Sequence, residues 1–161
     1  MAELRNYQKG DEGKIFDLIS SILSEYLLDI DPDETDSDLS DIERSYISSG
    51  GAFKVLVDNN NTIGSYGLYK IDNTTCELRK MYLNSTYRGR GFGILMMEDA
   101  FETAAGLDYK RMVLETNSVL KEAISLYKKY GFTEFKPDHM SCRCDIAMEK
   151  NLSPKNIKQK K

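Results

Sequence analysis

The sequence predicts a single α+β domain with a mixed sheet of about seven strands. Apolar residues recur every three or four positions in the first part of the chain, then alternate at every second position from Ala52 onward. A glycine-rich loop, residues 87–94, follows a strand pattern and opens a helical pattern. At 161 residues and 40% hydrophobic content, the chain is long enough for one well-formed core.

The first part of the chain predicts one strand followed by two helices. The strand runs from Glu3 to Tyr7, and a helix follows from Lys14 to about Leu28. The stretch Asp29 to Asp38 lacks periodicity and is expected to be a loop, after which Asp38 to Ser48 forms a short helix that ends at Gly50. We expect selection of a substrate to depend on these N-terminal helices.

Three strands are predicted next, as an antiparallel meander that leads into the glycine-rich loop. They span Phe53–Val57, Thr62–Ile71 and Thr75–Leu83, with polar turns at Asp58–Asn61 and Asp72–Asn73. The last of these strands would place its C-terminal end directly before the loop.

The remaining chain predicts two helices and three strands. We expect Gly106 to end the first helix in a left-handed conformation, and Asn117 or Ser118 to cap the second. The predicted elements are a helix at Ile94–Leu107, a strand at Arg111–Thr116, a helix from residue 118 to Tyr130, and strands at Phe132–Lys136 and Arg143–Met148.

The glycine-rich loop reads Tyr-Arg-Gly-Arg-Gly-Phe-Gly-Ile and has the properties of an anion site. Alternate glycines permit positive φ and a close approach of the backbone, so that several N–H groups can point at one phosphate. The following helix adds its N-terminal partial charge, and Arg88 and Arg90 can each bind phosphate oxygens. A dinucleotide fingerprint would need a third glycine at Ile94, and a Walker loop would need Gly-Lys-Ser/Thr, so neither motif is present.

The hexad Arg88-x-x-Gly91-x-Gly93 resembles the Arg/Gln-x-x-Gly-x-Gly/Ala signature of the GNAT superfamily of acyl-CoA-dependent N-acyltransferases. The segments Glu77–Leu83 and Ala123–Phe132 also resemble GNAT elements, and the resemblance extends over about residues 51–150. It implies a single GNAT acetyltransferase domain at residues 1–150, with a mixed, mostly antiparallel sheet and helices on both of its faces, followed by a basic C-terminal tail at residues 151–161.

The resemblance also implies how acetyl-CoA would bind. The strands Thr75–Leu83 and Arg111–Thr116 would be a splayed parallel pair, with the pantetheine arm between them bonded to the backbone around Met81, Tyr82 and Leu83. The diphosphate would lie on Arg88, Gly89, Arg90, Gly91, Phe92, Gly93 and Ile94. Many GNAT proteins carry an asparagine where this chain has Leu120, so the nearby Asn117 is only a candidate contact.

The resemblance implies acetyl transfer to a primary amine, on a small molecule or a peptide, by direct attack in a ternary complex. Tyr127 matches the tyrosine that protonates the departing thiolate, although its helical spacing also suits a core aromatic. Glu77 is the candidate base, with a simple ion pair to Arg79 or Lys80 as the alternative, and His139 is a weaker candidate. The alternative function is a non-catalytic acyl-CoA-binding sensor module.

Composition argues against a membrane protein, a metal-binding protein and a nucleic-acid-binding protein. No apolar run approaches a membrane span and no signal peptide is evident, so a cytoplasmic protein is expected. The odd cysteine count, Cys76, Cys142 and Cys144, predicts reduced thiols, with Cys142 and Cys144 on one strand face, and no metal site. The net charge is −4, with lysines gathered in the C-terminal tail, and the absence of aromatic residues among these lysines argues against binding of nucleic acid. Whether two copies form a homodimer stays open.

One acidic segment, residues 29–43, has two interpretations. It is either a solvated surface or, beside an active site, a means of concentrating cationic amines.

Overall fold

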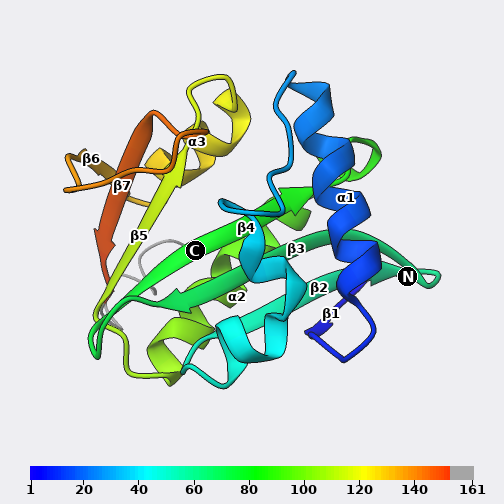
Figure 1. Cartoon of the computed structure of the whole chain (residues 1–161), viewed down its shortest axis with the longest axis horizontal. Coiled ribbons are helices and arrows are strands. Elements are labelled where there is room, and N and C mark those ends of the chain that lie inside the picture. Colours follow the sequence, from blue (N-terminus) through cyan, green and yellow to red (C-terminus); the bar gives the residue numbers. More distant parts are fainter. Residues whose placement is uncertain (153–161) are drawn as a thin grey trace.

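Seven strands form one sheet in the order β1-β2-β3-β4-β5-β7-β6 (Figure 1). The computed structural model describes residues 1–152, so nearly all of the predicted basic tail lies outside the described residues. The strands are β1 Glu3–Asn6, β2 Ala52–Asp58, β3 Asn61–Lys70, β4 Thr75–Leu83, β5 Arg111–Thr116, β6 Thr133–Phe135 and β7 Ile146–Asn151. All neighbours pair antiparallel except β4 and β5. The predicted fold class is confirmed.

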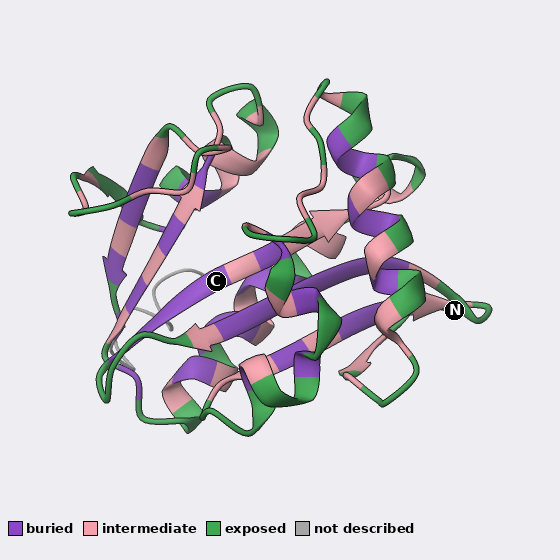
Figure 2. Cartoon of the chain, in the orientation of Figure 1, coloured by how far each residue is buried: buried purple, intermediate pink, exposed green. Residues whose placement is uncertain are grey.

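Three helices cover the two faces of the sheet. They are α1 Glu12–Glu25, α2 Phe92–Gly106 and α3 Lys121–Lys129. In Figure 1, α1 crosses in front of the central strands and α2 lies behind them. The buried face of α1 packs with Phe53 and Val55 in one apolar cluster, whereas Met97 and Phe101 of α2 pack with Tyr127 of α3 in the other. The buried residues follow the central strands between these two layers (Figure 2).

Strands β4 and β5 pair for only part of their length. Their parallel register runs from Thr75–Arg111 to Glu77–Val113, and β5 then continues to Thr116 bonded only to β7. One edge of β4 is therefore unpaired beyond Glu77. This opening is the predicted splay of the parallel pair.

A β-bulge interrupts β4 within the unpaired stretch. Gly67 of β3 is opposite Arg79 and Ser65 is opposite Tyr82, so two residues of β4 face one residue of β3. Lys80 occupies the bulge with φ of 57°, in the left-handed region that favours glycine. The bulge redirects the backbone of β4 at the point where the two strands have parted.

The predicted second helix at Asp38–Ser48 is wrong. The segment instead forms a 3₁₀ turn, η1 Ser37–Ser40, and a π-helical turn, η2 Glu43–Ile47. Asp38 accepts a hydrogen bond from Tyr46 of η2 and lies 3.6 Å from the guanidinium of Arg79, which is in β4. Side-chain contacts to the sheet thus replace the regular helix that the local spacing favoured.

Several predicted element ends also differ from the structure, and α1 ends at Glu25, before the predicted end at about Leu28. Leu120, with no side-chain cap, precedes α3, because Asn117 and Ser118 form a separate loop whose hydrogen bonds reach Arg143 and Asp145. The last strand begins at Ile146, so Cys142 and Cys144 precede it and do not share a strand face. The left-handed residue after α2 is Asp108, with φ of 68°, in place of Gly106.

Two composition-based expectations can be compared with the described residues. Cys76, Cys142 and Cys144 are all free thiols, as predicted. Over residues 1–152, no helix combines the length and apolar character that crossing a bilayer requires.

Candidate active site

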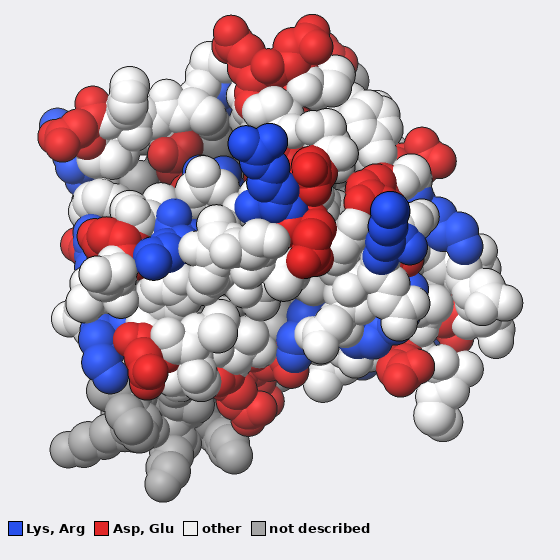
Figure 3. Space-filling view, turned by 60° about the horizontal axis from the view of Figure 1, so that its bottom comes forward, with Lys and Arg blue, Asp and Glu red and all other residues white. Residues whose placement is uncertain are grey.

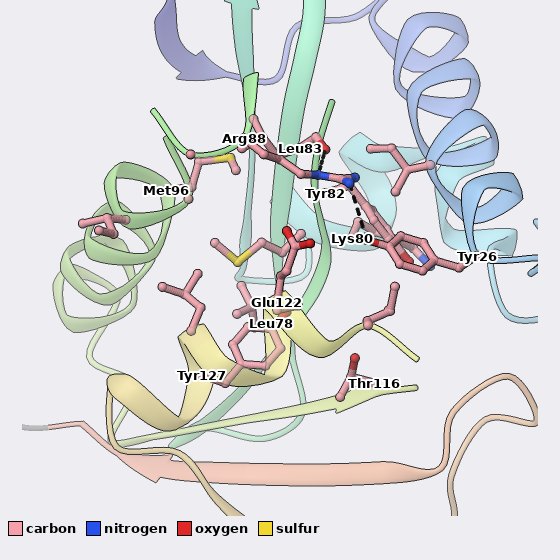
Figure 4. A pocket seen from close by; sticks show the side chains of 18 of the residues that line it. Tyr26, Leu78, Lys80, Tyr82, Leu83, Arg88, Met96, Thr116, Glu122 and Tyr127 are labelled. Carbon is pink, nitrogen blue, oxygen red and sulfur yellow. Dashed lines mark hydrogen bonds between the residues drawn. The ribbon is translucent and has the colours of Figure 1, made fainter. Parts of the chain in front are cut away.

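A cleft with a volume of about 330 Å³ opens between the end of α1, the free edge of β4, the glycine-rich loop and α3 (Figure 4). Several expected acetyl-CoA contacts line it, namely Met81, Tyr82, Leu83, Arg88, Gly89, Gly91, Gly93, Ile94 and Tyr127. The cleft thus brings together segments from four parts of the chain.

The glycine-rich loop presents unbonded backbone donors to this cleft. Gly89 and Gly91 have φ of 75° and 88°, and a Cβ built on either would meet no atom within 4 Å. The N–H groups of residues 89–94 have no acceptor among the described residues, and the first bonded amide is that of Leu95, which donates to Gly91. Together with the N-terminus of the long helix α2, these donors form a site that fits a diphosphate.

Arg88 lies beside these donors and is fixed by neighbouring segments. Its Nε donates to the carbonyl oxygen of Leu83 over 3.1 Å, and its Nη1 lies 3.2 Å from Glu25 Oε1 and 3.4 Å from the hydroxyl of Tyr26. Figure 4 shows the Arg88 side chain extended along the end of β4 toward Tyr26. Its Nη2 has no partner among the described residues, so it can donate to an anion while the other contacts persist.

Arg90 and Phe92 do not line the cleft. The Arg90 guanidinium lies over the ring of Tyr87, 4.9 Å from its centroid, and Phe92 packs against the same ring. The hydroxyl of Tyr87 donates to Asp58 over 2.8 Å. Both side chains pack on Tyr87 and not in the cleft, so only the backbone of residues 90 and 92 remains as an expected phosphate contact.

Residues 16–132 match the family model described as acetyltransferase (GNAT) family. The chain belongs to the GNAT family. It is 32% identical over 156 residues to the uncharacterized N-acetyltransferase YjgM of Escherichia coli K12. The matched stretch covers 91% of this chain and 93% of that protein. The predicted family and enzyme class, an acetyl-CoA-dependent N-acetyltransferase, are therefore confirmed.

Solved structures give the same result for the fold. A GNAT family acetyltransferase from Staphylococcus aureus Mu50 superposes with a TM-score of 0.89 at 26% identity, covering 95% of this chain and 100% of that one. An acetyltransferase from Streptococcus agalactiae 2603 gives a TM-score of 0.86 at 27% identity, with coverage of 94% and 98%. The sheet, its splay and the helices around it are thus those of the GNAT fold.

Tyr127 lies in the wall of the GNAT cleft on α3. Its side chain is 6% exposed and its ring packs edge-on against Phe132, with centroids 5.8 Å apart. Burial raises the pKa of Tyr127 above its ordinary value, and the nearby Tyr82 adds to this effect. The residue is both a core aromatic and a cleft residue, and its hydroxyl keeps its proton at neutral pH.

Glu77 is placed differently from the other candidates. It is the last residue of β4 that pairs with β5, it is 9% exposed, and it does not line the cleft. Its Oε1 accepts a hydrogen bond from Nε of Arg79 over 2.9 Å and lies 2.8 Å from Nη2 of the same guanidinium. Burial raises the pKa of Glu77, although the charge and hydrogen bonds of Arg79 act in the opposite direction.

The two other polar candidates also lie outside the cleft. Asn117 donates to the carbonyl oxygen of Arg143 over 2.9 Å and accepts from the amide of Val119, and Leu120 lines the cleft nearby. His139 is exposed in the loop between β6 and β7. The structure thus brings Tyr127 to the β4 edge and the loop, but not Glu77, Asn117 or His139.

Sequence reasoning missed several cleft residues that have no local signal of function. Ile22 and Tyr26 come from the apolar stripe of α1, which predicts burial but not a cleft wall. Glu122 extends into the cleft from the first turn of α3, where the helix N-terminus stabilises a carboxylate (Figure 4). Lys80 and Thr116 also line it.

The acidic segment is partly buried beside the cleft. The Asp36 carboxylate is fully buried and accepts from Lys80 Nζ over 2.6 Å and from two nitrogens of Arg143 at 2.6 and 3.0 Å. Burial by itself would raise the pKa of Asp36, but the hydrogen bonds of Arg143 and the charge of Lys80 lower this pKa to about 2. We call Asp36, Lys80 and Arg143 the Asp36 cluster. This part of the segment is neither solvated nor free to attract an amine.

Metal and nucleic acid find no further support. No group of three or more metal-ligating side chains occurs within the part of the chain that the structure describes. On the face drawn in Figure 3, acidic and basic side chains are interspersed and do not form a continuous basic stripe.

Proposed function

We propose that this GNAT protein transfers the acetyl group of acetyl-CoA to a primary amine by direct attack within a ternary complex. One observation carries the proposal. The unbonded amides of residues 89–94, the unpaired edge of β4 and the Tyr127 side chain all meet at one cleft. A diphosphate donor site, a strand edge for amides and a proton donor are what acyl-CoA chemistry needs in one place.

Binding of acetyl-CoA is assigned to the loop and to β4. The amides of residues 89–94 and the free Nη2 of Arg88 would bind the diphosphate. Backbone groups of Met81 and Leu83 would bind the pantetheine amides, because this edge of β4 has no neighbouring strand. The open space over Gly89 and Gly91 fits this assignment, since any larger residue would fill it.

Proton transfer is assigned to two residues on different sides of the splay. Tyr127 donates a proton to the sulfur as the carbon–sulfur bond breaks, because its raised pKa keeps the hydroxyl protonated until then. Glu77 accepts a proton from the substrate ammonium through water, because its carboxylate does not itself reach the cleft, and the resulting neutral amine is the nucleophile. The amine nitrogen forms the new bond to the acetyl carbon, and the products are an N-acetyl amine and CoA.

The proposal is tested by binding and turnover measured separately. Acetyl-CoA should raise the melting temperature of the protein more than equal concentrations of ATP or NAD do, because only the native cleft binds it. Release of CoA thiol from acetyl-CoA is then followed with polyamines, amino acids, aminoglycosides and peptides. Binding with thiol release for at least one amine supports the transferase. Binding with no release for any acceptor supports the sensor module, and an equal shift with NAD contradicts the cleft assignment.

A further inference from the structure

Lys80 has a backbone conformation that its residue type disfavours. Positive φ is otherwise found, within residues 1–152, at glycines and at Leu27, Asn59, Asn60 and Asp108, which all lie outside strands. Lys80 is inside β4, at the position of a bulge that glycine usually occupies. For a residue with a Cβ this conformation is unfavourable, so other contacts must stabilise it.

Lys80 makes contacts through both its side-chain ammonium and its backbone carbonyl oxygen. Its Nζ lies 2.6 Å from Asp36 Oδ1, 3.2 Å from the carbonyl oxygen of Thr35 and 3.3 Å from Asp38 Oδ1. Its carbonyl oxygen accepts a hydrogen bond from the hydroxyl of Ser65 over 2.7 Å, fully inside the protein. The side chain is therefore fixed by the Asp36 cluster and the backbone by β3.

These contacts lie directly beside the β4 edge. Met81 follows the bulge residue, and the β4–β5 pairing has already ended at Glu77. The direction of the Met81 backbone groups therefore depends on the φ of Lys80. A different φ at Lys80 would therefore change the direction of these groups relative to the cleft that Met81 lines.

We infer that Asp36 and Ser65 are positioning residues for the binding of acetyl-CoA. Both residues stabilise the left-handed conformation of Lys80 and thereby direct the backbone groups of Met81, at the unpaired edge of β4, into the cleft. The inference rests on the proposed function, in which that edge binds acetyl-CoA. It assigns to the lysine ammonium a conformational role and no contact with substrate.

Replacement of Lys80 by alanine and by glycine separates a conformational role from a role of the charge. Both variants lose the ammonium, but only glycine adopts positive φ without strain. We expect Lys80→Ala to weaken acetyl-CoA binding, measured by calorimetry, by about 10-fold, and Lys80→Gly to stay within about threefold of the wild type. Equal losses in the two variants, or wild-type binding in both, would overturn the inference.

Lys54 provides the matched control. It lies in β2, its Nζ is 2.8 Å from Asp99 Oδ2, and its φ is not positive. Because glycine weakens an ordinary strand relative to alanine, Lys54→Gly should be no better than Lys54→Ala in stability or binding. A gain by glycine at both positions would show a general effect that has nothing to do with the bulge.

Ser65→Ala tests the same role with a smaller change, so the inference stays testable if the Lys80 variants fold poorly. It should weaken acetyl-CoA binding about threefold in the wild-type background and have no effect on binding when combined with Lys80→Gly. An equal loss in both backgrounds would contradict the inference. Absence of acetyl-CoA binding by the wild-type protein would instead refute the proposed function, so the two failures are distinguishable.

Discussion

The Arg143 guanidinium donates to both carboxylate oxygens of Asp36, Nη1 to Oδ2 over 2.6 Å and Nη2 to Oδ1 over 3.0 Å, between residues 107 positions apart. Arg143 Nη1 also donates to the carbonyl oxygen of Asp29 over 3.1 Å. The loop that precedes β7 is thereby joined to the segment that follows α1. Both segments lie beside the end of the cleft where Tyr26 and Lys80 are found.

Arg143→Met should destabilise the fold strongly, because it leaves Asp36 buried with Lys80 as its only cation. We expect a loss of about 3 kcal/mol in the free energy of unfolding, measured with urea. Arg5→Met is the control, since Arg5 makes the same two-nitrogen contact to Asp11, at 2.8 and 3.0 Å, but is 27% exposed. It should cost less than about 1 kcal/mol. Equal losses would mean that burial of the Asp36 cluster adds nothing.

The low pKa of Asp36 predicts a specific acid sensitivity. Its folded-state pKa of about 2 lies below the ordinary value of 3.8, so its contribution to stability is complete above about pH 4 and is lost as the pH falls toward 2. Asp36→Asn should be less stable than the wild type at pH 7 and should lose less stability between pH 4 and pH 2. Parallel stability curves for the two proteins over this range would exclude Asp36 as a source of the acid response.

Gly91→Asp should abolish acetyl-CoA binding while the protein still folds. The change introduces a Cβ and a carboxylate over the unbonded amides, so steric exclusion and charge repulsion act together. Gly10→Asp is the control, because Gly10 has a positive φ of 104° and open space around it but lies far from the cleft in the chain before α1. Both variants should lose similar stability, and only Gly91→Asp should lose calorimetric binding. Retained binding would make the loop merely structural.

Glu77→Gln should lower the acetylation rate near neutral pH and recover part of it as the pH rises. An alkylamine with a pKa near 10 becomes neutral there without help, so a base is no longer needed. Because burial raises the pKa of Glu77, the wild-type rate should fall as acid protonates that carboxylate, and the variant should lack this step. Glu149→Gln is the control, since Glu149 pairs with Arg111 at 2.6 Å outside the cleft. Rate profiles that coincide for wild type and Glu77→Gln would remove Glu77 as the base.

Tyr127→Phe should leave stability and acetyl-CoA affinity almost unchanged. If the hydroxyl protonates the departing sulfur, kcat and kcat/KM should fall together by roughly 10²–10⁴. Tyr130→Phe is the control, because Tyr130 is also buried and lies just beyond α3 but does not line the cleft. Its hydroxyl donates a hydrogen bond to Glu98 over 3.3 Å. A wild-type kcat in Tyr127→Phe would reduce Tyr127 to a core residue, and a loss of affinity alone would make it a binding residue.

Much of the fold could be predicted because its signals are local. The strand alternation around Val55 and the helical stripe from Ile15 reflect which face of each element is buried, and that face is encoded in the spacing. The glycine-rich loop was predicted for the same reason, since Gly89 and Gly91 both adopt the positive φ that glycine permits.

The missed features depend on contacts between distant residues. Lys80 carries no glycine signal, and its left-handed conformation is stabilised by Asp36 and Ser65, which are 44 and 15 positions away. The alternation around Arg143 suggested a strand, but its ion pair to Asp36 belongs to a loop. Asn117 is a good capping residue by type, yet it bonds Arg143 instead. Local spacing cannot indicate such partners.

The Asp36 cluster has a consequence for how this enzyme can diverge. Its members come from three separate segments, and Asp36 is fully buried. A change at Asp36 takes a shared partner from two cations, and a change at either cation leaves the buried carboxylate with one cation in place of two, so each change lowers the stability of the fold. New acceptor preferences should therefore arise first through substitutions of residues that line the cleft without belonging to the cluster, such as Tyr26 and Thr116. In descendants of this chain, residues 36, 80 and 143 should be replaced together or retained together.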